Sequence, residues 1–155
     1  MAIVKRSDLS KGLVGTAGEY LVAGELSRRG YIASLTLRNA RGIDILVSDE
    51  EAKRSVGIQV KTKQGGGREW ILSQKIEKMD LAKNLFFVFV NLNGLGDPEY
   101  FVIPRKRVAD YASSRHSRWL STPGVRGQQR KDSPIRKFAD PEGKYLNRRD
   151  LLGLG

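Results

Sequence analysis

The chain has 155 residues, of which 39% are hydrophobic and 29% charged, with no cysteine and a single histidine, His116. This length suits one domain with a hydrophobic core. The lack of cysteine excludes disulfides and thiolate metal sites, and one histidine excludes a zinc site built from several histidines. No apolar run approaches the ~18 residues of a membrane span and no signal-peptide pattern is present, so we expect a cytoplasmic protein without membrane contact.

The net charge of +11 is concentrated toward the C-terminus. Residues 1–103 hold 15 Lys and Arg against 12 Asp and Glu, whereas residues 104–155 hold 13 against 5. A surplus of this size favours a polyanionic partner, because contacts to phosphates release counterions. A solvated basic surface without a partner is the alternative.

The first half of the chain predicts one helix and three strands. Apolar residues at spacings of three and four predict a helix over residues 13–29, and Gly30 follows as a helix stop. Stretches rich in β-branched and aromatic residues then predict strands over residues 31–37, 43–48 and 55–63. The turns between these strands are basic or charged.

The second half predicts a mixture of strands and helices. After the glycine-rich connector 64–67, we expect a short strand 70–73, a helix 74–84, a strand 85–92 and a strand 100–103. The strand 85–92 is nearly all apolar, which is typical of burial on both faces. Pro104 is expected to start a helix that ends near residue 114. Residues 121–134 have little apolar content and are expected to be irregular.

Three polar side chains stand out on the second and third predicted strands. Because alternate residues of a strand face the same way, Ile58 and Val60 can pack on the core while Gln59 and Lys61 face a cleft. On the neighbouring strand, Asp44 lies in an otherwise apolar run, where a carboxylate is costly unless something binds it. The sequence thus brings an acid, an amide and an ammonium to the edge of one sheet.

These residue types match the chemistry of a divalent metal site. Mg²⁺ prefers hard oxygen ligands, which Asp44, the side chain of Gln59 and the carbonyl of Val60 could supply, and Mn²⁺ is the expected substitute. Lys61 could orient or deprotonate a water, or stabilise charge on a phosphorus. On the first helix, Glu19 has no cation three or four residues away and is the candidate for a further inward-facing acid.

The motifs Gly15-Thr-Ala-Gly-Glu19, Gly42-Ile-Asp44-Ile-Leu-Val47 and Ile58-Gln-Val-Lys61 resemble those of the PD-(D/E)xK nuclease superfamily, which includes restriction endonucleases and archaeal Holliday-junction resolvases. The resemblance covers about residues 13–103. It implies an α/β fold with a restriction-endonuclease-like core, a central mixed β-sheet flanked by helices. It also implies that Asp44 is the first metal-binding acid, Lys61 the catalytic lysine and Glu19 the helix acid. Gln59 stands where the family usually carries Asp or Glu, so one negative ligand is missing.

We therefore interpret residues 1–155 as a single nuclease-like domain, with a core over about 13–103 and a basic C-terminal extension over about 104–155. The predicted function is metal-dependent hydrolysis of DNA, and cutting both strands would require a homodimer. The predicted DNA contacts are basic residues that flank the motifs: Arg38, Arg41, Lys63, Arg105 and Arg107. A nuclease fold that binds nucleic acid without turnover is the main alternative, and an RNA-associated protein without a metal site is another.

Each candidate residue also has a structural interpretation. Asp44 could be a strand-edge acid paired with Arg41 or Lys61, and Lys61 an edge lysine that discourages aggregation. Glu19 could be a surface glutamate, and Gln59 a structural hydrogen-bonding residue. His116 is expected to be non-catalytic. Both tryptophans are expected in the core or in docking contacts, with base-stacking platforms as the alternative.

Overall fold

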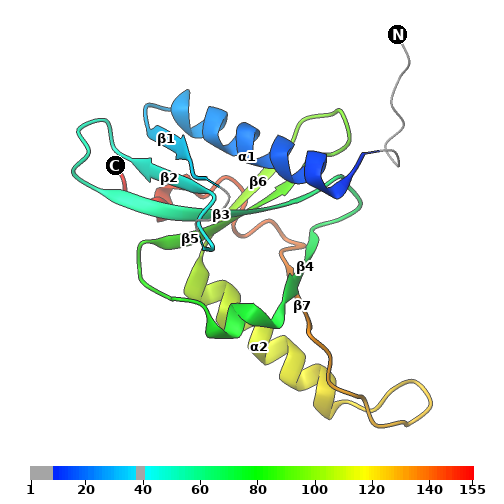
Figure 1. Cartoon of the computed structure of the whole chain (residues 1–155). Helices are drawn as coiled ribbons and strands as arrows, with labels where there is room; N and C mark the ends of the chain where they lie inside the picture. The colour runs from blue at the N-terminus through cyan, green and yellow to red at the C-terminus, as the bar shows by residue number, and fades with distance from the viewer. Residues whose placement is uncertain (1–8, 38–40) are drawn as a thin grey trace.

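The computed structural model describes residues 9–37 and 41–155, and these residues form a five-stranded mixed sheet. The strand order is β1-β2-β3-β5-β6, and every neighbouring pair is antiparallel except β3 and β5, which are parallel. Figure 1 shows this sheet at the centre of the molecule. Its strands are β1 (Ile32–Leu35), β2 (Ile45–Ser48), β3 (Ser55–Lys63), β5 (Leu85–Asn91) and β6 (Glu99–Pro104).

Two helices of the described chain cover opposite faces of this sheet (Figure 1). Helix α1 (Lys11–Ser27) buries Val14, Val22 and Leu26 in a cluster that includes Ile58 and Val60 of β3. Helix α2 (Arg105–Ser121) buries Val108, Ala109 and Ala112 in a second cluster with Phe87 and Phe89 of β5. All seven residues of β5 are buried, since both of its faces are covered.

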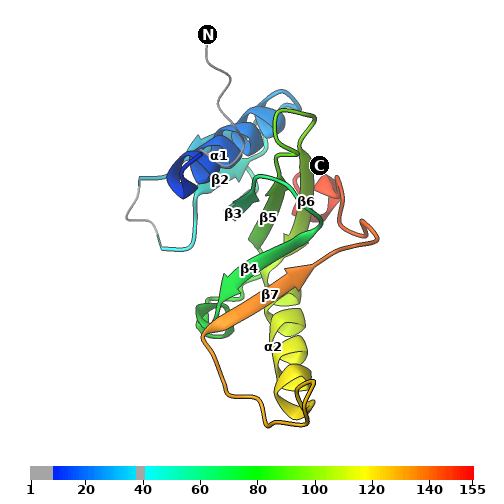
Figure 2. The ribbon, with the colours of Figure 1, turned by 90° about the vertical axis from the view of Figure 1, so that its right-hand side faces the viewer.

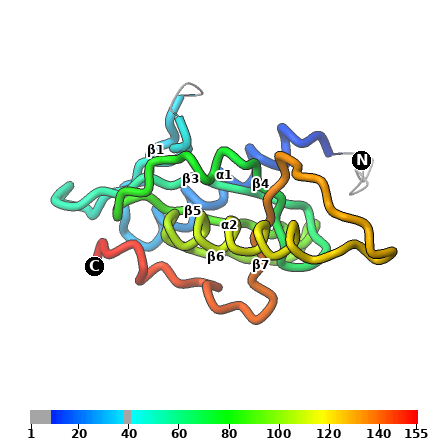
Figure 3. Tube along the Cα trace, turned by 90° about the horizontal axis from the view of Figure 1, so that it is seen from below, coloured from blue at the N-terminus to red at the C-terminus, as the bar shows by residue number. Residues whose placement is uncertain are grey.

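A second, two-stranded sheet lies beside α2 (Figure 2). It pairs β4 (Glu69–Ser73) with β7 (Ile135–Ala139) in antiparallel register, and Trp70 lies opposite Phe138. The view from below shows α2 in front of the sheet, with β7 beside the helix (Figure 3). The short 3₁₀ helix η3 (Arg149–Leu152) then packs against β6 and contributes Leu152 to the core.

The contact between α1 and β3 depends on Gly18, a residue without a side chain. A Cβ atom built on Gly18 would lie 1.7 Å from Oγ1 of Thr62, so glycine is the residue that lets the helix approach the strand. Ser10 caps the helix, because its side chain accepts a hydrogen bond from the backbone N–H of Leu13. These two features fix where α1 begins and how closely it packs on the sheet.

Most predicted elements are confirmed within a few residues, but three expectations are wrong. The predicted helix 74–84 is only a 3₁₀ turn, η2 (Gln74–Lys78), because Met79 is extended and Asp80 accepts a hydrogen bond from the N–H of Ala82. Pro104 ends β6 and precedes α2 rather than starting it, and α2 continues to Ser121. Strand β2 begins at Ile45, so Asp44 lies just before it.

The C-terminal third contributes to the core more than the sequence suggested. Phe138 of β7 and Leu152 and Leu154 near the C-terminus are buried. Residues 122–134 lie between α2 and β7 without a helix or strand, as predicted. No helix among the described residues has the length and apolar content needed to cross a membrane.

Candidate functional site

Asp44 is held in place by hydrogen bonds of its backbone and its side chain at the start of β2. Its backbone N–H donates to the carbonyl of Ile58 at 2.8 Å, and its carbonyl accepts from the N–H of Thr36 at 2.9 Å. Its carboxylate Oδ2 accepts a hydrogen bond from the backbone N–H of Val60 at 2.7 Å. The carboxylate is therefore fixed against the middle of β3, where Gln59 and Lys61 flank Val60.

Strand β3 extends beyond the end of β2. Residues 55–58 of β3 pair with β2, whereas residues 57–63 pair with β5 on the other side. Residues 59–63 consequently have no β2 partner in the ladder, and the Asp44 carboxylate takes the place of that partner at Val60. Because the N–H and C=O of one strand residue point to the same side, the Val60 carbonyl also faces this edge.

Gln59 and Lys61 lie on the face of β3 opposite α1, as the alternation predicts. Their neighbours Ile58 and Val60 belong to the cluster beneath α1. The side-chain Oε1 of Gln59 is buried and has no hydrogen-bond partner among the described residues. A buried oxygen without a partner costs free energy, and a bound ligand at this position would supply the partner. The Gln59 oxygen therefore fits the role of a ligand to a metal ion.

Lys61 lines a cleft of about 580 Å³ beside the free edge of β3. The other walls come from the start of α1, with Lys11 and Val14, and from β4, with Glu69 and Trp70. Neither Arg41 nor Lys61 forms an ion pair with Asp44 within the described residues. The interpretation of Asp44 as half of a salt bridge with either residue is therefore wrong.

Glu19 is half-buried on α1, directly after the glycine that touches Thr62. Helix α1, which carries Glu19, packs on the face of the sheet that holds Ile58 and Val60. Within residues 9–37 and 41–155, no three His, Cys, Asp or Glu side chains gather closely enough to hold a metal ion.

Arg105 is a site residue whose place the sequence did not reveal. Its side chain is 3% exposed, so the expectation that it reaches a backbone phosphate at the surface was wrong. It donates to the carbonyl of Gly42 and, at 3.4 Å, to the carbonyl of Asp80. Burial lowers the pKa of this guanidinium, while the charges of Asp80 and Asp44 act in the opposite direction. Arg105 thus anchors the loop before Asp44 and places a positive charge near it.

The other predicted DNA contacts differ in their availability. Arg41 and Arg107 are exposed. The Nζ of Lys63 donates to the carbonyls of Gly66 at 2.9 Å and Glu69 at 2.8 Å, so this lysine closes the glycine-rich turn. Arg38 lies outside the described residues.

Comparison with known proteins gives a match of fold. No family model matches the chain, and no curated protein sequence matches it significantly. Among solved structures, the chain resembles Hjc of Archaeoglobus fulgidus, a Holliday junction resolvase from an archaeal hyperthermophile, with a TM-score of 0.53 and 14% sequence identity. The match covers 91% of this chain and 97% of Hjc. The chain therefore has the restriction-endonuclease-like fold, a central mixed sheet flanked by helices, that Hjc also has.

Proposed function

We propose that this protein is a metal-dependent DNA endonuclease that uses the edge of β3 as its active site. The observation that carries the proposal is the 2.7 Å hydrogen bond from the Val60 N–H to the Asp44 carboxylate. This bond fixes an acid next to the strand segment that carries Gln59 and Lys61. The fold shared with a Holliday junction resolvase supports the same conclusion.

The residues divide into metal ligands and a phosphate-facing cation. Asp44, the Oε1 of Gln59 and the carbonyl of Val60 would hold Mg²⁺ or Mn²⁺, with Glu19 as a further acid. When bound, the metal would polarise a phosphate oxygen and lower the pKa of a bound water. The ammonium of Lys61, which lines the cleft, would orient the water or stabilise negative charge on the phosphate.

DNA would lie along the free edge of β3, beside the cleft that Lys61 lines. Arg41, just before the Asp44 loop, and Arg107, in the first turn of α2, are exposed and would contact backbone phosphates. Such contacts position the duplex but read no sequence. We therefore expect DNA binding that weakens steeply as the salt concentration rises.

Cleavage assays test this proposal. The protein is incubated with plasmid and with four-way branched DNA in Mg²⁺ or Mn²⁺, beside the variants Asp44→Ala and Lys61→Ala. Lys53→Ala, which removes a lysine from the exposed turn between β2 and β3, is the matched control. We expect the wild type and the control to cleave and both site variants to lose activity. Cleavage that persists in both site variants would refute the assignment.

A nucleic-acid-binding module without turnover is the second candidate function. Two observations favour it: Gln59 provides an oxygen without a charge, and the described residues contain no group of three His, Cys, Asp or Glu side chains that could hold a metal ion. This candidate predicts DNA binding that is unchanged by a chelator and by Asp44→Ala, with no cleavage of any substrate.

The proposal includes a homodimer in the cytoplasm. One chain carries one site, and cutting two strands requires two sites. The edge strand β1 and its neighbour expose apolar side chains, with Ile32 47% and Leu46 50% exposed, that a second copy could cover. Light scattering coupled to size exclusion distinguishes the dimer from a monomer of 17.3 kDa.

A further inference from the structure

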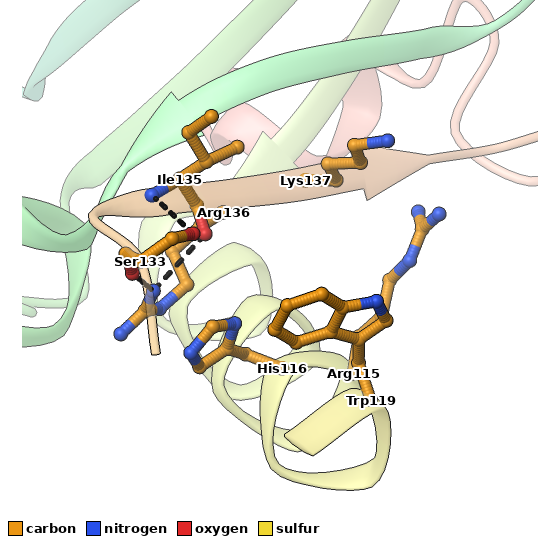
Figure 4. Close-up of a pocket in the computed structure, with 7 residues that line it drawn as sticks. All are labelled: Arg115, His116, Trp119, Ser133, Ile135, Arg136 and Lys137. Carbon is orange, nitrogen blue, oxygen red and sulfur yellow. Dashed lines mark hydrogen bonds between the residues drawn. The ribbon is translucent and has the colours of Figure 1, made fainter. Parts of the chain in front are cut away.

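A second hollow, away from Asp44 and Lys61, lies between the C-terminal half of α2 and β7. It measures about 260 Å³ and is lined by Arg115, His116 and Trp119 of α2 and by residues around Ile135. Figure 4 shows the rings of His116 and Trp119 projecting from the helix toward β7. Trp70 is buried as expected, whereas Trp119 is 38% exposed and forms part of this wall.

The two rings form a fixed aromatic surface. The centroids of His116 and Trp119 are 5.6 Å apart and their planes differ by 23°. His116 Nε2 lies 2.7 Å from Oδ1 of Asp132, which holds the imidazole in its orientation. On its other side, Trp119 borders a hollow of about 380 Å³, and the guanidinium of Arg130 lies 4.8 Å from its ring centroid.

This aromatic surface is surrounded by positive charge. Residues 115–137 contain seven Lys and Arg and only one acid, Asp132. Glu69 pairs with Arg115 and Lys137, and Glu77 pairs with Arg136. In the part of the chain that the structure describes, no acid pairs with Arg118, Arg126 or Lys131. Arg118, which lines the same hollow as Trp119, therefore remains for an anionic ligand beside the rings.

We infer that this pocket binds single-stranded DNA by stacking an unpaired base on the His116–Trp119 surface. Proteins that bind single strands combine stacking aromatic side chains with cations along the phosphate backbone. A duplex cannot use the pocket, because its bases are already stacked and paired. Arg118 and Lys131 would take the flanking phosphates. Only the choice of DNA as the polymer rests on the proposed function.

Binding without cleavage tests the inference, since all titrations are performed in EDTA. Fluorescein-labelled dT12 and a 12-base-pair duplex are titrated with the full chain and followed by anisotropy. We expect Trp119→Ala to weaken dT12 binding roughly ten-fold or more and to leave duplex binding nearly unchanged. Single-strand binding should also quench the tryptophan fluorescence of the wild type. Trp119→Phe, which keeps an aromatic ring, should bind more tightly than Trp119→Ala and lose the quenching.

Charge variants separate stacking from general attraction. Arg118→Gln should reduce the slope of log K against log salt by about 0.7 for the single strand, whereas Lys53→Gln, at a distant exposed turn, should not. Equal affinities for rU12 and dT12 would support a pocket that contacts the base and the phosphate but not the sugar. An unchanged dT12 affinity in Trp119→Ala, equal losses for duplex and single strand, or quenching that survives in Trp119→Phe would overturn the inference. None of these results depends on whether the protein cleaves DNA.

Discussion

The Asp44 carboxylate takes the place of a strand partner for Val60. Where β2 no longer pairs with β3, Oδ2 of Asp44 accepts a hydrogen bond from the backbone N–H of Val60 at 2.7 Å. One side chain therefore ends the β2–β3 ladder and presents a second carboxylate oxygen at the same edge. Asp44 thus serves both the stability of the place where β2 and β3 diverge and the chemistry proposed there. Stability needs its hydrogen-bond acceptor, whereas the chemistry needs its negative charge.

Substitutions of Asp44 separate those two properties. Asp44→Asn keeps an oxygen that can accept the Val60 N–H, so it should unfold at a urea concentration close to that of the wild type. Asp44→Ala leaves that half-buried N–H without a partner, which costs about 1–3 kcal/mol. Both variants should lose cleavage, because neither provides a charged metal ligand. An Asp44→Asn variant with full cleavage activity would contradict the role of the carboxylate.

Gln59→Glu restores the charge that the usual acid would provide. We expect the variant to bind Mn²⁺ more tightly than the wild type in calorimetric titrations. Without metal, the new carboxylate is buried without a partner and should lower the free energy of unfolding. Added Mg²⁺ should reverse this loss, because a ligand that binds only the folded state stabilises it.

The control for this change is Gln74→Glu, in the exposed first turn of η2. It introduces the same charge far from Asp44 and should change neither Mn²⁺ affinity nor the response of stability to Mg²⁺. If Gln59→Glu behaved like Gln74→Glu in both measurements, Gln59 would not face a metal site.

The sequence predicted the strands and the polar residues of β3 well, because alternation and apolar content are local signals. Strand β3 has the predicted bounds, and Gln59 and Lys61 lie on the predicted face. The burial of Arg105 could not be predicted, since its partners Gly42 and Asp80 lie 63 and 25 residues away in the chain. An arginine after a β-strand resembles an exposed helix start until the tertiary contacts are known.

The C-terminal third was the hardest part to predict for a related reason. Strand β7 is short, with Ile135 exposed and Arg136 buried, and it pairs with β4 across more than sixty residues. The aromatic pocket arises only when β7 is placed beside α2, so neither His116 nor Trp119 signals it locally. In the sequence, only the aromatic residue Phe138 indicated that this segment is ordered, and the structure shows that it is buried.

The ion pair between Glu99 and Arg68 makes stability depend on pH. Its atoms lie 2.5 Å apart, and hydrogen bonding to Arg68 lowers the pKa of Glu99 below its usual value of 4.5. A lowered folded-state pKa means that stability is present above pH 4.5 and is lost as the pH falls through the folded-state value. Glu99→Gln should therefore destabilise more at pH 7 than at pH 3.5 in urea unfolding. Glu142→Gln, at an exposed turn, should show no such difference.

Gly18 and Thr62 test how closely α1 must approach β3. A methyl group at Gly18 would meet Thr62 Oγ1 at 1.7 Å and two carbons at 2.8 and 2.9 Å, so Gly18→Ala should lower the free energy of unfolding by about 1–3 kcal/mol. The same change at Gly24 meets nothing within 4 Å and should stabilise the helix by roughly 0.5–1 kcal/mol. Thr62→Ala removes Oγ1 and the carbon at 2.9 Å but keeps Cβ at 2.8 Å, and because Oγ1 has no partner among the described residues, it should partly rescue Gly18→Ala. Urea unfolding of the two single glycine variants and the double variant measures these differences. If Gly18→Ala proved as stable as Gly24→Ala, the close packing of α1 on β3 would not hold, and with it the placement of Glu19 beside the strand.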